Sequence, residues 1–177
     1  MKGFGLIGAT LMLLLVPALS AGAQTPAPAQ AQAPADADAR AVQLVRDFHA
    51  SWQEGRVDAL LAYLSEDCYY ENIPPVGPVG GMTGQATIRA FLADVFNKDA
   101  LTVPYSLTAE VKQIVAAGDT VTVERIDHFA IGKSHIALPV LAIFKIKDGK
   151  ITSWRDYFDG DTLKPALYLM QALKRST

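Results

Sequence analysis

The chain has 177 residues, of which 50% are hydrophobic, and its 16 basic and 18 acidic residues give a net charge of -2 at pH 7. This length and composition fit one ordinary domain with a packed core, and the sequence has no basic patch that would bind nucleic acid or anionic lipid. Cys68 is the single cysteine and cannot form an intrachain disulfide, so stability must come from packing.

The first segment has the three parts of a secretory signal peptide. Lys2 precedes an apolar run from Leu6 to Leu19, and the small residues Ala21-Gly22-Ala23 follow. The alternative, a retained membrane anchor, needs about 20 apolar residues, which is longer than this run. We therefore expect cleavage after Ala23 and an exported protein, periplasmic or secreted, that is soluble and not attached to a membrane after cleavage.

Residues 24–39 form a low-complexity segment. They repeat Ala, Pro and Gln and include two Asp, a composition too poor in large apolar groups to fold. We predict a disordered tether here, following the signal peptide at residues 1–23. Residues 40–177 then form a single domain, since the sequence has no internal repeat and no second composition break.

The first half of the domain is predicted to be mainly helical. Apolar residues recur at helical spacing from Arg40 to Trp52, and Gly55 follows as a stop. A second helix is predicted over Val57–Leu64. A short strand, Asp67–Asn72, follows it, and the Pro- and Gly-rich stretch Ile73–Gly81 is predicted to be an apolar loop at the mouth of a cavity.

The second half changes from helical to strand periodicity. A helix with Thr83 as its candidate cap comes first, and its apolar face ends at Phe96. Short turns then separate segments with period-two alternation, which makes neighbouring strands antiparallel. The predicted elements are the strands Tyr105–Ala116, Thr120–Ile131, Ile136–Lys147 and Lys150–Phe158, and a closing helix over Asp161–Lys174.

This order of elements predicts an α+β domain. A curved mixed or antiparallel sheet would wrap around the N-terminal helices and leave a cone-shaped buried pocket.

Charged residues interrupt the inward face of two predicted strands. Alternation along Val121–Phe129 puts Arg125 and Asp127 on one face that is apolar at both ends. The planar fork of a guanidinium can bridge two carboxylates, so this arginine can pair with a second acid.

The second acid is Asp156, in the last strand. Alternation there puts Trp154, Asp156 and Phe158 on one face and Ile151 on the other. A carboxylate between two aromatic side chains is costly to ionise unless it is paired. We therefore predict a triad in which Arg125 joins Asp127 and Asp156 inside a mostly apolar cavity.

Three segments carry a resemblance to a known family. Tyr70-Glu71-Asn72, Glu124-Arg125-Ile126-Asp127 and Trp154-Arg155-Asp156-Tyr157-Phe158-Asp159 resemble the Tyr-x-Asn, Glu-Arg-x-Asp and Trp-Arg-Asp-Tyr-Phe-Asp segments of limonene-1,2-epoxide hydrolases. The likeness runs from about Arg40 to about Leu173 in the same order of elements. It implies the cystatin-like cone shared with nuclear transport factor 2 (the NTF2-like fold), ketosteroid isomerases and polyketide cyclases of the SnoaL type.

The resemblance implies that water opens a small apolar epoxide to a vicinal diol in one step, without a covalent intermediate, a metal or another cofactor. Asp156 would be the general base, and Tyr70 and Asn72 would hold the water that it deprotonates. Asp127 would be the general acid at the epoxide oxygen, and Arg125 would fix both carboxylates. Five side chains, Trp154, Phe158, Phe129, Leu138 and Val140, are expected to be pocket wall or core.

Simpler explanations exist for each of these residues. Arg125 and Asp127 alone could be a structural ion pair, Tyr70 a core aromatic, and Asn72 a cap of the turn into the proline loop. The histidines have no metal-ligand spacing, and His128 lies on the face opposite Asp127 by alternation.

Two alternative functions remain open for the whole chain. One is an isomerase or cyclase on the same cone, in which Asp156 removes a proton from carbon. The other is a non-catalytic exported domain that binds a hydrophobic ligand. The outward apolar residues Ile126, Leu141 and Ile143 indicate a homodimer face, which the resemblance also implies.

Overall fold

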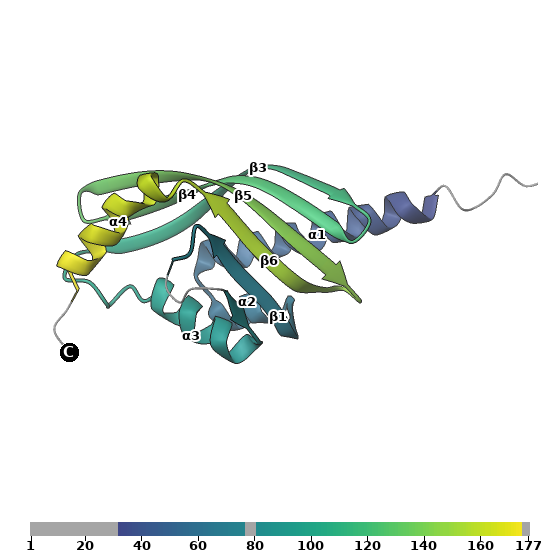
Figure 1. Ribbon diagram of the computed structural model, residues 1–177, viewed down its shortest axis with the longest axis horizontal. Coiled ribbons are helices and arrows are strands. Elements are labelled where there is room, and N and C mark those ends of the chain that lie inside the picture. The colour runs from purple at the N-terminus through teal and green to yellow at the C-terminus, as the bar shows by residue number, and fades with distance from the viewer. Residues whose placement is uncertain (1–31, 77–80, 175–177) are drawn as a thin grey trace, which may run out of the picture.

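The computed structural model describes residues 32–76 and 81–174 of the chain (Figure 1). The predicted signal peptide and residues 24–31 of the predicted tether lie outside the described residues. The elements in chain order are α1 (Gln32–Glu54), α2 (Val57–Leu61), β1 (Leu64–Ile73), β2 (Met82–Thr83), α3 (Gln85–Val95), β3 (Tyr105–Ala117), β4 (Thr120–Ile131), β5 (Ser134–Lys147), β6 (Lys150–Phe158) and α4 (Gly160–Ala172).

The sheet is mixed and strongly curved. Its strand order is β2-β1-β6-β5-β4-β3, and β3 to β6 form an antiparallel meander while β1 runs parallel to β6. Figure 1 shows the long strands arching past α1, with α3 close to β1 and α4 near one end of the sheet. The α+β cone with a curved sheet and N-terminal helices is therefore confirmed.

The core lies between α1 and the concave face of the sheet. Phe48 of α1 is fully buried, and its ring centroid is 5.7 Å from that of Phe144 on β5 and 5.2 Å from that of Trp154 on β6. Val121 and Val123 of β4 are also fully buried on this face. Burial of these side chains holds α1 against the sheet, because removing apolar surface from water is the main favourable term in folding.

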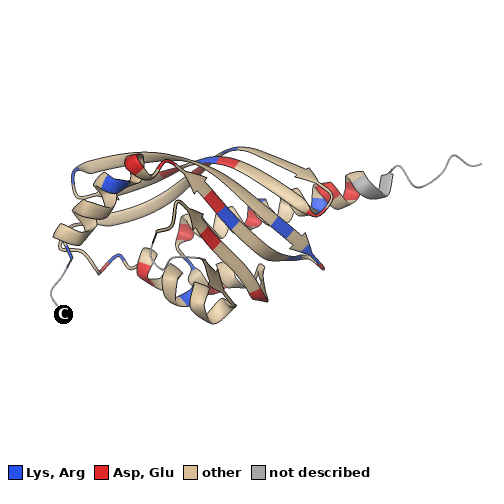
Figure 2. Ribbon diagram, in the orientation of Figure 1, with Lys and Arg blue, Asp and Glu red and all other residues tan. Residues whose placement is uncertain are grey.

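Basic and acidic residues do not separate into distinct regions of the fold. Figure 2 shows basic and acidic residues interspersed along the strands and helices. Within residues 32–76 and 81–174, none of the helices has both the length and the apolar character that a membrane span needs.

The helix boundaries differ from the prediction at α1 and α2. The tether was predicted to end at Ala39, but α1 already begins at Gln32, since alanine has the highest helix propensity and a helix extends cheaply from a packed segment. Asp38 also accepts a hydrogen bond from the backbone N–H of Gly118 at 3.0 Å. The second helix ends at Leu61 because the chain then joins the sheet, where the Tyr63 carbonyl accepts from the N–H of Ile151 at 2.9 Å.

Two further local predictions were wrong. The cap of α3 is Gly84, with φ 88°, because Thr83 belongs to β2 and pairs with Tyr69. Ile151 is fully buried instead of facing outward. An irregularity in the pairing of β5 with β6 shifts the register next to Ile151 and reverses the alternation there.

Candidate active site

Two of the three motif segments are direct neighbours in the sheet. Because β1 pairs with β6 in parallel, Tyr70 lies opposite Trp154 and Asn72 lies opposite Asp156. Tyr70 and Asp156 are buried, as the alternation of each strand predicts for the inward face. The Tyr-x-Asn segment is thus placed beside the acid of β6 by backbone pairing.

The third motif lies two strands away, on β4. The strand between, β5, carries Ala142 opposite Asp156 and Val123, and Val140 opposite Arg125. Because alanine is small, the long side chain of Arg125 can cross over β5 to reach the acid on β6.

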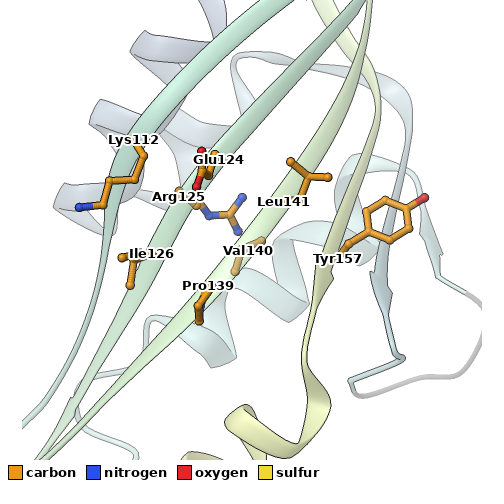
Figure 3. A pocket seen from close by; sticks show the side chains of 8 residues that line it. All are labelled: Lys112, Glu124, Arg125, Ile126, Pro139, Val140, Leu141 and Tyr157. Atoms are coloured by element: carbon orange, nitrogen blue, oxygen red, sulfur yellow. The ribbon is translucent and has the colours of Figure 1, made fainter.

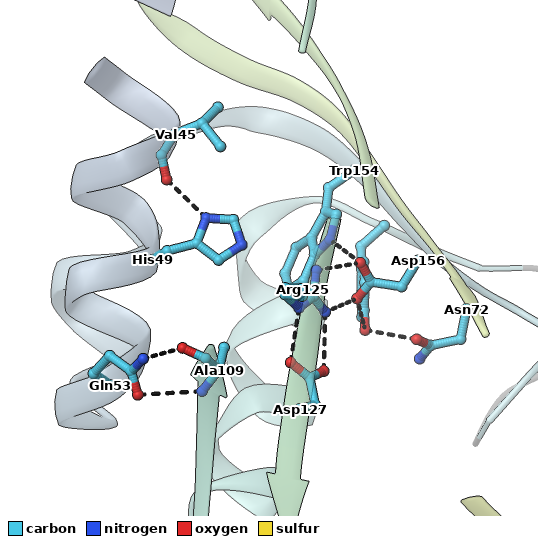
Figure 4. A network of polar contacts seen from close by, with 10 residues as sticks. Val45, His49, Gln53, Asn72, Ala109, Arg125, Asp127, Trp154 and Asp156 are labelled. Atoms are coloured by element: carbon cyan, nitrogen blue, oxygen red, sulfur yellow. Dashed lines mark hydrogen bonds and ion pairs between the residues drawn. The ribbon is translucent and has the colours of Figure 1, made fainter. Parts of the chain in front are cut away.

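Arg125 binds both acids with its fork (Figure 4). Its Nε donates to Asp127 Oδ1 at 2.8 Å and its Nη2 to Asp127 Oδ2 at 3.1 Å. On the other side Nη1 donates to Asp156 Oδ1 at 2.9 Å and Nη2 to Asp156 Oδ2 at 3.0 Å. All three residues are buried, so the predicted triad is present as a buried group in which Arg125 makes four hydrogen bonds to the two acids.

Among the described residues, Asp156 has further hydrogen-bond donors that Asp127 does not have. The indole N–H of Trp154 donates to Asp156 Oδ1 at 2.7 Å, and the Tyr70 hydroxyl lies 3.4 Å from Asp156 Oδ2. That hydroxyl is also 2.9 Å from Asn72 Oδ1. A phenol has one hydrogen and can donate to only one of these two acceptors at a time. If the Asn72 amide were turned around, the amide nitrogen would donate to the phenol oxygen, and the Tyr70 hydroxyl could then donate to Asp156.

Burial raises the pKa values of two side chains of the site. It raises the pKa of Asp127 above its usual range, even though the positive charge and hydrogen bonds of Arg125 act in the opposite direction. Burial, followed by the charge of Asp156, also raises the pKa of Tyr70 well above 10. Asp127 is therefore the acid that takes up a proton more readily than an ordinary carboxyl, and Tyr70 stays a hydroxyl donor.

A histidine of α1 lies behind the triad. Burial, followed by the charge of Arg125, lowers the pKa of His49 to about 4. The ring is therefore neutral near pH 7, and its Nδ1 lies 2.8 Å from the Val45 carbonyl, to which it donates (Figure 4). His49 thus packs beside Arg125 without adding a second positive charge.

The triad opens on a cavity of about 330 Å³, a size suited to a small organic molecule. Tyr70, Asn72, Arg125, Asp127 and Asp156 all contribute to its wall. Most of the remaining wall is apolar and comes from the sheet, the loop after β1, and helices α3 and α4: Val76, Phe91, Val95, Leu107, Phe129, Leu138, Phe158, Leu163, Leu167 and Met170.

Three of the five predicted wall residues, Phe129, Leu138 and Phe158, line this cavity. Trp154 and Val140 do not. Trp154 is fully buried beneath α1, with its ring 5.5 Å from that of Trp52, and it acts instead as a hydrogen-bond donor to Asp156. Val140 lies between Arg125 and Phe158 on the neighbouring strands, whose longer side chains form the wall there.

Among the cavity residues that sequence reasoning missed, three carry a polar atom in the side chain, namely Trp52, Asp94 and Tyr105. Trp52 lies on the apolar face of α1, and the guanidinium carbon of Arg125 is 5.8 Å from its ring centroid. Tyr105 has the same parity on β3 as Leu107, so alternation could have placed it. The inward position of Asp94 follows from how α3 docks, which no local pattern shows.

The opposite face of the sheet carries a shallow groove of mixed polarity. Figure 3 shows its lining side chains, which include Lys112, Glu124, Ile126 and Leu141. His128 also faces outward, as predicted, and lies 3.3 Å from Glu110. Among the residues that the structure describes, no three His, Cys, Asp or Glu side chains are grouped to hold a metal ion.

The comparisons with known proteins agree with the geometry. The sequence model described as the limonene-1,2-epoxide hydrolase catalytic domain matches residues 39–168. Epoxide hydrolase EphG of Mycobacterium tuberculosis is 30% identical over 115 residues, which cover 65% of this chain and 70% of that protein.

Solved structures show the same arrangement of elements. The LEH-like epoxide hydrolase of M. tuberculosis superposes with a TM-score of 0.61 at 26% identity, covering 76% of this chain and 94% of that one. A protein with a ketosteroid isomerase-like fold from Catenulispora acidiphila superposes with a TM-score of 0.56 at 23% identity, covering 68% and 88%. The second likeness concerns the fold alone.

Proposed function

Because the chain belongs to the limonene-1,2-epoxide hydrolase family, we propose that it adds water to a small apolar epoxide in one step, without a cofactor, and forms a vicinal diol. The observation that carries this proposal is the Arg125 fork, which holds two buried carboxylates at the wall of an apolar cavity. Tyr70 and Asn72 stand on the Asp156 side of that fork only. The two acids therefore have different surroundings, as a base and an acid require.

In the proposed reaction, Asp156 accepts a proton from a water molecule held by Tyr70 and Asn72. The water oxygen forms a bond to one epoxide carbon, and the bond between that carbon and the epoxide oxygen breaks. The epoxide oxygen takes the proton of Asp127. The products are the diol, a protonated Asp156 and an ionised Asp127, and one proton transfer between the two acids restores the starting state.

The protonation of the triad supports these roles. Attack by water needs one acid ionised, and release of the epoxide oxygen needs the other protonated. Asp127, whose pKa is raised by burial, is suited to hold the proton. Asp156 accepts hydrogen bonds from Arg125 and Trp154, and these bonds stabilise a negative charge on its carboxylate.

The test is hydrolysis of a panel of apolar epoxides by the purified protein in oxygen-18 water. We expect diols that carry one labelled oxygen, in the first turnover as well as later ones, because no oxygen of the protein enters the product. Asp58→Asn is the control for loss of an acid outside the triad, because its carboxylate is 84% exposed and far from the triad in the sequence. This variant should form the diol as the unaltered protein does. If no epoxide in the panel gives a diol, the hydrolase function is wrong.

The same experiment addresses the alternative enzyme class. An isomerase or cyclase would use Asp156 to take a proton from carbon, and its products would contain no labelled water oxygen. A domain that only binds a hydrophobic ligand would convert none of the epoxides. Labelled diol therefore supports hydrolysis over both other functions.

We also propose that two copies of the chain pair through the outer face of the sheet. Ile126, Leu141 and Ile143 share that face, and 45% of Leu141 is exposed in the single chain. Covering such residues is favourable when a second copy presents the same surface. Sedimentation at assay concentration should give a dimer, and a monomer would contradict the pairing.

The pattern of residues 1–23 supports a proposal of export. Expression with the complete sequence should yield protein outside the cytoplasm, with Gln24 as its first residue. Recovery of the uncleaved chain from the cytoplasm would contradict this localisation.

A further inference from the structure

One buried polar group in the cavity has no part in the proposed reaction. Tyr105, the first residue of β3, is 7% exposed and lines the cavity. Among the described residues its hydroxyl oxygen is buried without a hydrogen-bond partner. Buried hydroxyls in native proteins are nearly always satisfied, so this one requires a partner that the described residues do not supply.

The position of Tyr105 separates it from the water-binding side. Strand β3 lies at one edge of the sheet, while Tyr70 and Asn72 lie on β1 near the other edge. Asp127, on β4, stands between these two sides. Tyr105 pairs with Ile131 of β4. Ile131 is four residues beyond Asp127, so the backbone of Tyr105 lies about 13 Å from that of Asp127 in the direction of the strand.

The hydroxyl of Tyr105 is a stable donor. Burial, followed by the charges of Asp127 and Asp94, raises its pKa to about 12. It therefore keeps its proton across the working range of most enzymes.

Asp94 lines the same cavity and supplies an acceptor. It lies near the end of α3, is exposed to water, and is the one acidic residue of the cavity wall besides the two of the triad. A phenol that donates and a carboxylate that accepts together match a hydroxyl group, which can accept one hydrogen bond and donate another.

A second unpartnered group, the indole N–H of Trp52, offers a weaker case. Its ring is packed against Phe96, with centroids 4.9 Å apart, and against Trp154. This packing and the nearby guanidinium of Arg125 account for the position of Trp52. Tyr105 has no such explanation.

We propose that Tyr105 and Asp94 form a second polar subsite that binds a hydroxyl group of the substrate. The preferred substrates are then epoxy alcohols whose hydroxyl lies several bonds from the epoxide ring, joined to it by an apolar skeleton. The inference rests on the proposed epoxide hydrolysis and names the substrate class for it.

The test compares pairs of substrates that differ by one hydroxyl. Each pair consists of a 1,2-epoxyalkane and the same compound with a hydroxyl at its far end, in a series of increasing chain length. For the unaltered protein, kcat/KM should favour the hydroxylated member at one chain length. Tyr105→Phe should reduce that preference by about three- to tenfold, the effect of one neutral hydrogen bond, because kcat/KM falls more for the hydroxylated member than for the plain epoxide.

Asp94→Asn should reduce the preference less, because Asp94 is exposed to water. The matched control is Tyr168→Phe, which removes the same hydroxyl from a side chain of α4 that is 67% exposed and does not line the cavity. An unaltered preference in Tyr105→Phe, an equal loss on both members of each pair, or no preference in the unaltered protein would overturn the subsite.

Binding of the products separates this inference from the proposed function. Calorimetry measures the dissociation constants of the diols with and without the far hydroxyl, independently of turnover. Tighter binding of the hydroxylated diol that is lost in Tyr105→Phe supports the subsite even if no epoxide is hydrolysed. Turnover of epoxides without any such preference supports the hydrolase function and rejects the subsite.

Discussion

Replacement of Arg125 by lysine tests whether the guanidinium fork, and not only its charge, holds the site together. Lysine keeps the positive charge but presents three hydrogens from one nitrogen, so it cannot bind two carboxylates in a bidentate way. At least one of the four hydrogen bonds of Arg125 would be lost. At about 1.5 to 3 kcal/mol for each charged hydrogen bond, the free energy of unfolding should fall by at least this amount.

This loss is a considerable part of the total stability of a typical domain, about 5 to 15 kcal/mol. The measurement is urea unfolding followed by tryptophan fluorescence, together with epoxide hydrolysis under conditions where the variant is folded. We expect hydrolysis to fall by at least about a hundredfold, because Asp127 and Asp156 would no longer be held together.

Arg155→Lys is the matched control. Arg155 lies on β6 next to Asp156, but it points outward, is 38% exposed and contacts Glu71 at 3.3 Å. A surface pair of this kind contributes about 1 kcal/mol or less. If Arg125→Lys changed the stability and hydrolysis as little as Arg155→Lys does, the fork would not be the feature that organises the site.

Three more outcomes follow from the triad and its surroundings. Asp127→Asn and Asp156→Asn should each lower hydrolysis by about two to four powers of ten while near-ultraviolet circular dichroism stays native; near-normal turnover in either variant would contradict the acid and base roles. Because burial raises the pKa of Asp127 in the folded protein, its contribution to stability is present below the unfolded value of about 3.9 and is lost as the pH rises through the raised pKa. Asp127→Asn should remove this loss from a series of unfolding curves, and an unchanged pH dependence would argue against the raised pKa. His49 behaves in the opposite sense: with its pKa lowered from 6.5 to about 4, stability should decrease by up to roughly 3 kcal/mol as the pH falls through this interval, and His49→Gln should abolish that decrease.

Trp154 was placed on the correct face by the sequence, but its role came only from the structure. Alternation put it on the inward face beside Asp156, and it is fully buried there. The sequence left pocket wall and core open for Trp154, and the ring belongs to the core because Phe48 and Trp52 of α1 cover it. Its indole N–H instead donates to Asp156, and this contact makes Trp154 part of the hydrogen-bonded support of the base.

Local periodicity determined which side chains of each strand face inward. Two-residue alternation depends only on backbone geometry, so it placed Tyr70, Arg125, Asp127 and Asp156 on buried faces before any pairing was known. The same reasoning failed at Ile151, where an irregular pairing of two strands reverses the alternation. Such an irregularity arises between strands and has no signature within one of them.

Only the tertiary structure decided which inward side chains meet. The parallel pairing of β1 with β6 sets Asn72 opposite Asp156, and Ala142 on the intervening strand lets Arg125 reach across. The docking of α3 brings Asp94 to the cavity, and the edge position of β3 brings Tyr105 there. A sequence specifies the face of a residue through short-range geometry, whereas contacts between distant segments depend on strand order, register and the volume of the side chains between them.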